Sequence, residues 1–357
     1  MGWTCLLSNI AVFELEYIYL PCLLFLHLVA MPKTLFIFNS DLKRFIVRSF
    51  FFGTLVVLLS FALDVMISFG LRQTDCYRYE IFDEIIRGGM DHDVLIMGNS
   101  RGFSHFNTNI IDSICGADSY NIGLGGYPIN VQIAEYKCYK KHNALPKVII
   151  QEVSNGTLSW MSDIRYQHDS QRFFPTIYDK TMRKELSKLG YGFWELYCPL
   201  YRYFGYQKVI KDGLMEFLSL KHFVDRPTFK GFSPEKGEWD GTEAAMLDSI
   251  TASFEDVSIV LFEDFLAECK RDGVYVVLVN SPMYEPTTRK LTNYRELNSY
   301  FTETANRFGY VFLNYTENYD LCKDSSFFCV SIHLNPQGTA MFSTDFANQI
   351  NALDLLN

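Results

Sequence analysis

Val94-Leu95-Ile96-Met97-Gly98-Asn99-Ser100-Arg101 is the stretch of sequence that decides the fold. Its first four residues form a short, continuous apolar run, which is typical of a strand buried on both faces of a parallel sheet. Gly98 then permits a sharp strand-to-helix turn, which would place Ser100 at the carboxyl end of the strand. Open α/β sheets bind their ligands in the crevice at those strand ends. The stretch therefore predicts a parallel sheet with a serine at its binding edge.

Strand-like and helix-like segments alternate along most of the chain. Apolar runs predict five strands, over residues 94–97, 119–122, 148–153, 274–279 and 311–314. Helical stretches separate them, near residues 107–113, 129–141, 250–271 and 287–308, and a last helix opens at Asn335-Pro336. Strands spaced by helices predict an α/β fold, with helices on both faces of a central parallel sheet.

Residues 154–249 interrupt this alternation. The segment is rich in Tyr, Phe and Trp and has no clear strand period. We interpret it as a helical insertion over the edge of the sheet that caps the mouth of the site. A separate small domain is the alternative, although no linker stands out. The whole region 72–357 then forms one α/β domain with an insertion.

Residues 49–71 form an apolar run that is broken only by Asp64. The run is long enough to cross a hydrocarbon core of about 30 Å as a helix, which predicts a transmembrane segment. Basic residues are concentrated before it, so the positive-inside rule places residues 1–48 in the cytoplasm and residues 72–357 outside. A buried core helix is the alternative. Asp64 would be costly in lipid unless it faces a partner or lies near the outer interface.

Residues 17–31 are also apolar, but this run is short. It could be a second span, an interfacial helix or, because Met31 would make an ordinary start, the product of an upstream start codon. We therefore predict a single-pass protein of the cell membrane from residues 49–71 alone.

Charge and cysteine content exclude several classes of function. The net charge of −9 and the absence of a cluster of Lys and Arg in the body of the chain argue against a nucleic-acid partner. The nine cysteines and seven histidines are scattered without metal-ligand spacing, so we expect neither a metal nor a cofactor. Cys322 and Cys329 are close enough to form a disulfide, although buried thiols are the expectation for most of the set.

A second motif, His333-Leu334-Asn335-Pro336-Gln337-Gly338, lies near the end of the chain. A serine and a histidine at strand ends can act as a nucleophile and its base. The segment around Ser100 resembles the Gly-Asp/Asn-Ser block of the SGNH (GDSL-like) hydrolases, and this second motif resembles their C-terminal histidine block. The resemblance covers roughly residues 92–355. It implies a three-layer, flavodoxin-like sandwich with strand order 2-1-3-4-5, in which Ser100 is the nucleophile and His333 the general base.

The same resemblance implies an oxyanion hole. Gly123, with Gly125 as the second choice, follows the second strand where the family keeps a glycine whose amide binds the oxyanion. Asn155 follows the third strand, where the family supplies an asparagine side chain, and the amide of Ser100 would be the third donor. A plain turn remains the alternative at both places.

One position departs from the family pattern. Val330 stands three residues before His333, where the family has the aspartate that orients the histidine. Loss of such a carboxylate costs a serine protease about 10⁴ in turnover. A main-chain carbonyl, Asp320 or Asp324 could orient His333 instead. The sequence thus indicates a Ser-His dyad with a missing or displaced third member, or a site that has lost activity.

The resemblance implies ester chemistry at the cell envelope. Membrane anchoring is similar to that of proteins that act in D-alanylation of teichoic acids and O-acetylation of exported polysaccharides. We therefore expect an esterase or O-acyltransferase for an acylated glycan or another ester, with a membrane-bound acyltransferase as a candidate partner. Arg101 would bind an anionic substrate, or it would simply be solvated. The alternatives are an inactive carbohydrate-binding or assembly protein, and a structural membrane protein whose aromatic insertion docks a partner.

Overall fold

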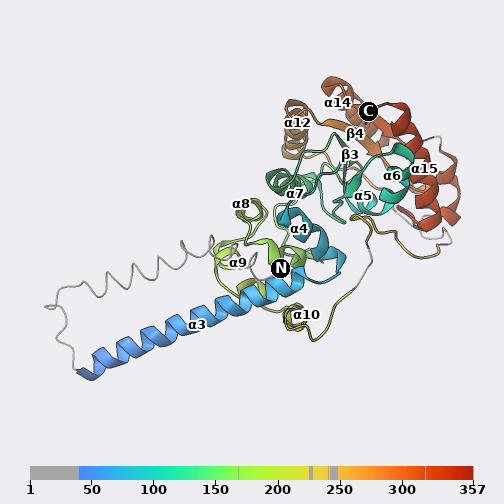
Figure 1. The fold of residues 1–357 in the computed structure, drawn as a ribbon. Coiled ribbons are helices and arrows are strands. Elements are labelled where there is room, and N and C mark those ends of the chain that lie inside the picture. Colours follow the sequence, from blue (N-terminus) through green and yellow to red (C-terminus); the bar gives the residue numbers. More distant parts are fainter. Residues whose placement is uncertain are drawn as a thin grey trace. The chain divides into compact units, whose positions relative to one another are not determined.

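The computed structural model describes residues 40–167, 169–224, 228–239, 241, 248–317 and 319–356 (Figure 1). Residues 17–31, and most of the predicted cytoplasmic segment, lie outside the described residues. The chain divides into two compact units, residues 1–59 and residues 60–357. The insertion belongs to the second unit, together with the sheet.

A five-stranded parallel sheet is the centre of the unit formed by residues 60–357. Its strands are β1 (Val94–Met97), β2 (Ser119–Asn121), β3 (Val148–Glu152), β4 (Tyr275–Asn280) and β5 (Val311–Asn314). Their order across the sheet is β2-β1-β3-β4-β5, which confirms the predicted topology. In the register of the ladder, Val94 pairs with Ser119 on one side and with Val148 on the other. From β1 the chain adds β2 on one side of the sheet and then β3, β4 and β5 on the other. The boundary between β1 and β3 is therefore the switch point where α/β sheets bind ligands.

The helices around the strands are α4 (Tyr77–Arg87), α5 (Ser100–His105), α6 (Thr108–Cys115), α7 (Ile129–His142), α12 (Asp256–Arg271), α13 (Glu285–Thr288), α14 (Tyr294–Phe308) and α15 (Pro336–Ala352). They include the predicted ones, with shifted ends, and also α4, α5 and α13. Two predicted helices, over residues 250–271 and 287–308, were too long. Ile250 and Leu291 form a parallel bridge, and the N–H of Thr292 donates to the carbonyl of Ile250 at 2.8 Å. These bonds hold both segments extended.

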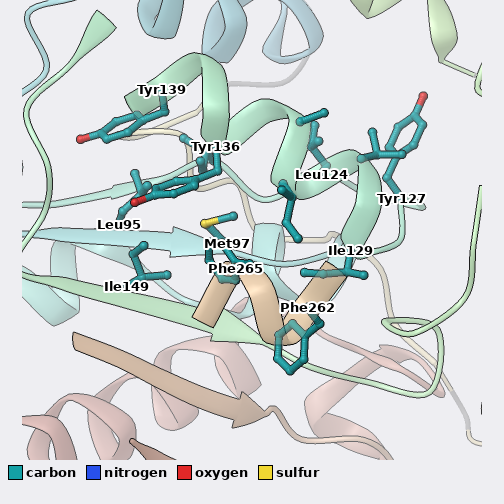
Figure 2. Close-up of a cluster of buried hydrophobic side chains, with 14 of the residues drawn as sticks. Leu95, Met97, Leu124, Tyr127, Ile129, Tyr136, Tyr139, Ile149, Phe262 and Phe265 are labelled. Carbon is teal, nitrogen blue, oxygen red and sulfur yellow. The ribbon is translucent and has the colours of Figure 1, made fainter. Parts of the chain in front are cut away.

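The two faces of the sheet are buried under different helices. Leu95, Met97 and Ile149 belong to a core that includes α7 and α12, with Tyr136 and Phe265 among its residues (Figure 2). Because successive side chains of a strand point to opposite faces, the residues between them form the other core. Val94, Ile96 and Val148 pack there with residues of α15. The strands are therefore apolar on both faces, which is why they read as continuous runs rather than as alternating ones.

Helix α3 (Ser40–Arg72) is, within the described part of the chain, the one helix long and apolar enough to cross a membrane. Its last turns belong to the second unit and are covered by protein, because Ile67 and Leu71 are buried with Tyr203. Asp64 is also fully buried. The candidate span, Asp41–Arg72, contains the predicted run over residues 49–71, and protein covers Asp64, Ile67 and Leu71 near its end.

Asp64 is held by a short 3₁₀ helix, η3 (Tyr201–Tyr203). Its carboxylate accepts hydrogen bonds from both terminal nitrogens of the Arg202 guanidinium, one of them Nη1 at 2.9 Å, and from the main-chain N–H of Leu200 at 2.6 Å. The hydroxyl of Tyr178 donates to the same carboxylate. The acidic residue that would be costly in lipid thus has a charged partner inside the protein.

The described part of residues 154–249 contains five short helices. Its elements are η2 (Ser170–Thr176), α8 (Lys180–Lys188), α9 (Phe193–Tyr197), η3 and α10 (Gln207–Phe217). Within the second unit, η2 packs against α4 and α8 against α7, and α10 joins the cluster around the last turns of α3. The chain after α10 reaches the edge of the sheet, where the N–H of Asn121 donates to the carbonyl of Lys230 at 2.9 Å. Farther on, Trp239 packs against Phe328.

The seven cysteines of the described residues form no disulfide with one another. Cys322 and Cys329, the pair considered from the sequence, are engaged separately. The thiol of Cys322 donates to the carbonyl of Tyr315 at 3.1 Å, and that of Cys329 to the carbonyl of His333 at 3.5 Å.

The buried ion pair gives the first prediction. Asp64→Ala leaves the Arg202 guanidinium buried without its counter-ion, which destabilises a protein by about 3–5 kcal/mol. We expect a large drop in the thermal unfolding midpoint of the detergent-solubilised chain. Asp41→Ala is the matched control, because Asp41 lies exposed in the first turn of the same helix, 3.7 Å from Arg44. Equal midpoints for the two variants would contradict the role given to Asp64.

Candidate active site

Ser100 begins α5 directly after the turn that ends β1. Gly98 in this turn has φ +144°, and a methyl group there would lie 2.6 Å from Cβ of Glu152, so a larger residue would not fit. Asn99 caps the helix, because its side-chain oxygen accepts the N–H of Arg101 at 2.9 Å. As the first residue of α5, Ser100 has a main-chain N–H with no acceptor inside the helix. The turn therefore presents both the hydroxyl and the N–H of Ser100.

His333 is carried by a small antiparallel hairpin, β6 (Phe328–Val330) and β7 (His333–Leu334). Asn335 follows and caps α15, accepting the N–H of Gly338 at 3.0 Å. Nε2 of His333 lies 2.8 Å from Oγ of Ser100, although the two residues are 233 positions apart. With Nε2 unprotonated, the serine hydroxyl donates to the imidazole. This is the hydrogen bond that a general base needs with its nucleophile.

The glycine-rich turn after β2 also reaches this site. The N–H of Gly123 donates to Oδ1 of Asn121 at 2.9 Å, so it is used within the turn. Gly123 is the glycine that the sequence predicts as an oxyanion donor. Gly125, the second choice from the sequence, lies against the nucleophile, since a methyl group there would be 3.7 Å from Cβ of Ser100.

Asn155 lies at the same edge of the sheet as Ser100. It follows β3, the neighbour of β1. Nδ2 of Asn99 donates to Oγ of Ser154 at 2.7 Å, which ties the end of β3 to the turn before Ser100. Asn155 is half-buried, and its main-chain carbonyl accepts the N–H of Ser253 at 3.2 Å.

Arg101 is buried, in contrast to the expectation of a solvated side chain. It is only 4% exposed. Its Nη2 donates to Oδ1 of Asn280 at 2.7 Å, and its Nε to Oγ of Ser281 at 3.1 Å. Both partners lie at the carboxyl end of β4, so Arg101 fastens the helix that begins at Ser100 to the sheet.

Glu152, the last residue of β3, is the counter-ion of Arg101. Its Oε1 lies 3.2 Å from Nε of the arginine, and its side chain is fully buried. Burial raises the pKa of Glu152 to about 7, and the nearby guanidinium opposes this rise. The positive charge next to the nucleophile is thus paired inside the protein.

His105 joins α5, the helix that begins at Ser100, to the hairpin of His333. It is fully buried at the end of α5. Its Nε2 accepts the main-chain N–H of Leu334 at 3.1 Å, so its proton is on Nδ1, which donates to Oγ of Ser281 at 2.9 Å. Burial, with smaller contributions from Arg101 and His333, lowers the pKa of His105 well below 6.5, so the ring stays neutral.

Sequence reasoning missed Glu152, His105, Asn280 and Ser281. A signal was present for Glu152, because a charged residue at the end of a buried apolar strand needs a partner. The position of Arg101, directly after the nucleophile, offered that partner. His105 gave no comparable signal, since a histidine near the end of a short helix is usually a capping or surface residue.

Asp320 and Asp324 are engaged away from the histidine. The side chain of Asp320 is 95% exposed and accepts a hydrogen bond from Nζ of Lys323 at 2.6 Å. The side chain of Asp324 accepts the N–H of Ser326 at 2.9 Å and caps a 3₁₀ turn. Val330, in contrast, is the direct partner of His333 in the hairpin register.

The role of His105 gives the second prediction. His105→Phe removes the acceptor of the Leu334 N–H and leaves that buried group unpaired, at a cost of about 1–3 kcal/mol. We expect kcat for an aryl acetate to fall by about tenfold or more, with a smaller change in KM. His105→Gln, whose amide oxygen can accept the same N–H, should recover part of the loss. Equal loss in both variants, or a loss confined to KM, would contradict a positioning role.

A cavity of about 1070 Å³ lies elsewhere, between α13, α14 and the loop that contains Cys322. Neither Ser100 nor His333 lines it. The candidate site is therefore identified by the geometry of its side chains. No protein-family model matches this chain, and no curated protein matches it either.

Proposed function

We propose that this protein is a membrane-anchored esterase or O-acyltransferase of the SGNH type, acting on ester groups of a cell-envelope polysaccharide. The observation that carries the proposal is the 2.8 Å contact between Oγ of Ser100 and Nε2 of His333. The position of Ser100 supports it, because the nucleophile begins a helix at the switch point of the sheet. The apolar helix α3 supports attachment to a membrane.

In the first step, Oγ of Ser100 attacks the carbonyl carbon of the ester while Nε2 of His333 takes the hydroxyl proton. The negative charge that develops on the carbonyl oxygen would be held by the N–H groups of Ser100 and Gly125 and by the side-chain amide of Asn155. Collapse of this intermediate breaks the ester bond. The departing alcohol takes the proton from the imidazolium, and the acyl group stays on Ser100.

The second step repeats the first with another nucleophile. Water or a sugar hydroxyl gives its proton to Nε2 of His333 and attacks the acyl-serine, and the proton returns to Oγ of Ser100. Water produces hydrolysis, whereas a sugar hydroxyl produces transfer of the acyl group. Arg101 acts in neither step, because it is buried and bound to the end of β4. Its contribution is to hold the helix that carries the nucleophile.

Val330 favours a second candidate function. An apolar residue is paired with His333 where the resembling family has its aspartate, and 37% of its surface is exposed. A site that holds a glycan ester without cleaving it would need no carboxylate there. Under this alternative, the protein is a carbohydrate-binding or assembly protein with the architecture of an esterase.

Trapping of the acyl-enzyme decides between the two. The purified full-length chain is incubated with p-nitrophenyl acetate, quenched with acid and digested for mass spectrometry. We expect an acetyl group on the peptide that carries Ser100. Steady release of p-nitrophenol without that adduct would assign the hydrolysis to another group, and an absence of both would favour the binding protein.

Membrane topology is the third prediction. Lys43, Arg44 and Arg48 precede the apolar run, and the positive-inside rule places them in the cytoplasm. A phosphatase reporter that is active only outside the cytoplasm should therefore be active when fused after the last residue. A reporter that is active only when it remains in the cytoplasm would contradict the proposed envelope substrate.

A further inference from the structure

The insertion exposes a cluster of aromatic side chains, which we call the aromatic patch: Phe193, Trp194, Tyr197, Tyr201 and Phe204. Their exposed fractions run from 45% for Tyr197 to 88% for Phe204. Four of the rings form a connected group, since Phe193 stacks on Tyr197 with ring centroids 5.3 Å apart and contacts Trp194 at 5.5 Å. Trp194 in turn lies 6.2 Å from Tyr201. Contiguous exposed apolar surface of this kind usually marks a binding face.

The aromatic patch is tied to one position of helix α3. Tyr201 stands between Leu200 and Arg202, and both of these neighbours donate hydrogen bonds to the carboxylate of Asp64. The buried ring of Tyr203 continues this attachment, because its hydroxyl lies 2.8 Å from Oγ of Ser68. The exposed rings of Tyr201 and Phe204 therefore flank two buried anchors, Arg202 and Tyr203, which hold this part of the patch beside Asp64.

Asp64 marks a boundary along α3. The residues after it, such as Ile67 and Leu71, are buried by the second unit. The residues before it form the apolar run that is suited to lipid, and large side chains such as Leu55 and Leu59 are exposed in that run. A helix that spans a bilayer through this run would leave the hydrocarbon shortly before Asp64. Side chains anchored at Asp64 would then be at the depth of the lipid headgroups.

We infer that the aromatic patch binds the headgroup region of the same bilayer that α3 crosses. Trp and Tyr are enriched at this depth, because each ring has an apolar body and a polar end. Trp194 and Tyr201 provide that chemistry, and the fully apolar ring of Phe204 can reach into the upper acyl chains. The protein then has two contacts with the membrane, the helix and the patch. The inference rests on the membrane helix and is independent of the esterase chemistry.

Fluorescence quenching tests the inference on the full-length chain in lipid nanodiscs. Nanodiscs are prepared either with ordinary phosphatidylcholine or with phosphatidylcholine brominated near the headgroup end of its acyl chains. Bromine quenches tryptophan only at short range. We expect bromine to quench the emission of Trp194. The Trp194→Phe variant should therefore show much weaker quenching than the unmodified chain.

Trp239→Phe is the matched control. Trp239 packs against Tyr284, away from the patch in the sequence and beside the hairpin of His333, so its removal should leave the quenching in place. Adding Phe204→Trp to the Trp194→Phe chain should restore quenching, because residue 204 is highly exposed and tolerates the larger ring.

Two outcomes would overturn the inference. Emission from Trp194 that bromine does not quench, at the long wavelength of a tryptophan in water, would show that the patch is solvated. Unquenched emission at short wavelength would show that protein covers the patch, and a protein partner would replace the lipid. Either outcome leaves the acyl-enzyme result unaffected, so the failure of this inference is distinguishable from the failure of the proposed function.

Discussion

Replacing Ser100 with alanine is expected to abolish ester hydrolysis by the full-length chain, with turnover falling by about 10³-fold or more. The change removes the hydroxyl oxygen that lies 2.8 Å from Nε2 of His333. The fold should be unaffected, because Asn99 and not Ser100 provides the side-chain cap of α5. The measurement is the steady rate of p-nitrophenol release, together with the thermal unfolding midpoint.

Ser326→Ala is the control for this prediction. Ser326 lies exposed in the loop before the hairpin, where its main-chain N–H, not its hydroxyl, is bound by Asp324. We expect this variant to hydrolyse the ester at the unmodified rate. If Ser100→Ala retained that rate as well, the catalytic assignment would be wrong, whatever the thermal midpoint.

Replacing Val330 with aspartate is expected to raise esterase turnover, up to a ceiling of about 10⁴-fold. Val330 and His333 are direct partners in the hairpin, and side chains of such partners stand on the same face about 5 Å apart. A carboxylate there would favour the imidazolium, so it would raise the pKa of His333 and strengthen the general base. The measurement is kcat for an aryl acetate as a function of pH.

Three variants separate this effect from other consequences of the change. Val330→Asn supplies a side chain of the same size without charge, so it should give little of the gain. Ile332→Asp places a charge in the turn of the hairpin at a residue of similar exposure, and it tests for a general effect of negative charge. Asp320→Asn should leave the rate unchanged, because Asp320 is bound to Lys323. Equal rates for the Asp and Asn variants at residue 330 would contradict the prediction.

Much of the fold was predictable because its strands are buried on both faces. Val94–Met97 and Val311–Asn314 were predicted with the bounds that the structure has, since short apolar runs between helices have few alternatives. Helix ends were less predictable. The bridge between Ile250 and Leu291 joins segments 41 positions apart, and no local pattern announces it. The end of the membrane-suited run was also hidden, because it depends on the pairing of Asp64 with Arg202.

The candidate site, like the fold, has parts that the sequence predicts and parts that it does not. Ser100 and His333 were found because each lies in a motif at the end of a strand, and the fold brings them to hydrogen-bond distance. Gly123 was preferred to Gly125 because spacing does not reveal which amide the side chain of Asn121 occupies. Arg101 was misjudged for a related reason. A charged residue after a nucleophile is expected near substrate, and only tertiary structure shows that Glu152 and the end of β4 bind it.

The state of the cysteines affects the redox conditions under which this domain can fold and remain folded. Burial raises the pKa of Cys322 to about 11 and that of Cys269 to about 12, while Cys138 is shifted in the same direction. The thiolate is the form that reacts with oxidants and attacks disulfides, so these groups react slowly at neutral pH. The described residues are stabilised by packing, because their seven cysteines form no disulfide with one another. These buried thiols would therefore persist in reducing and in oxidising surroundings alike.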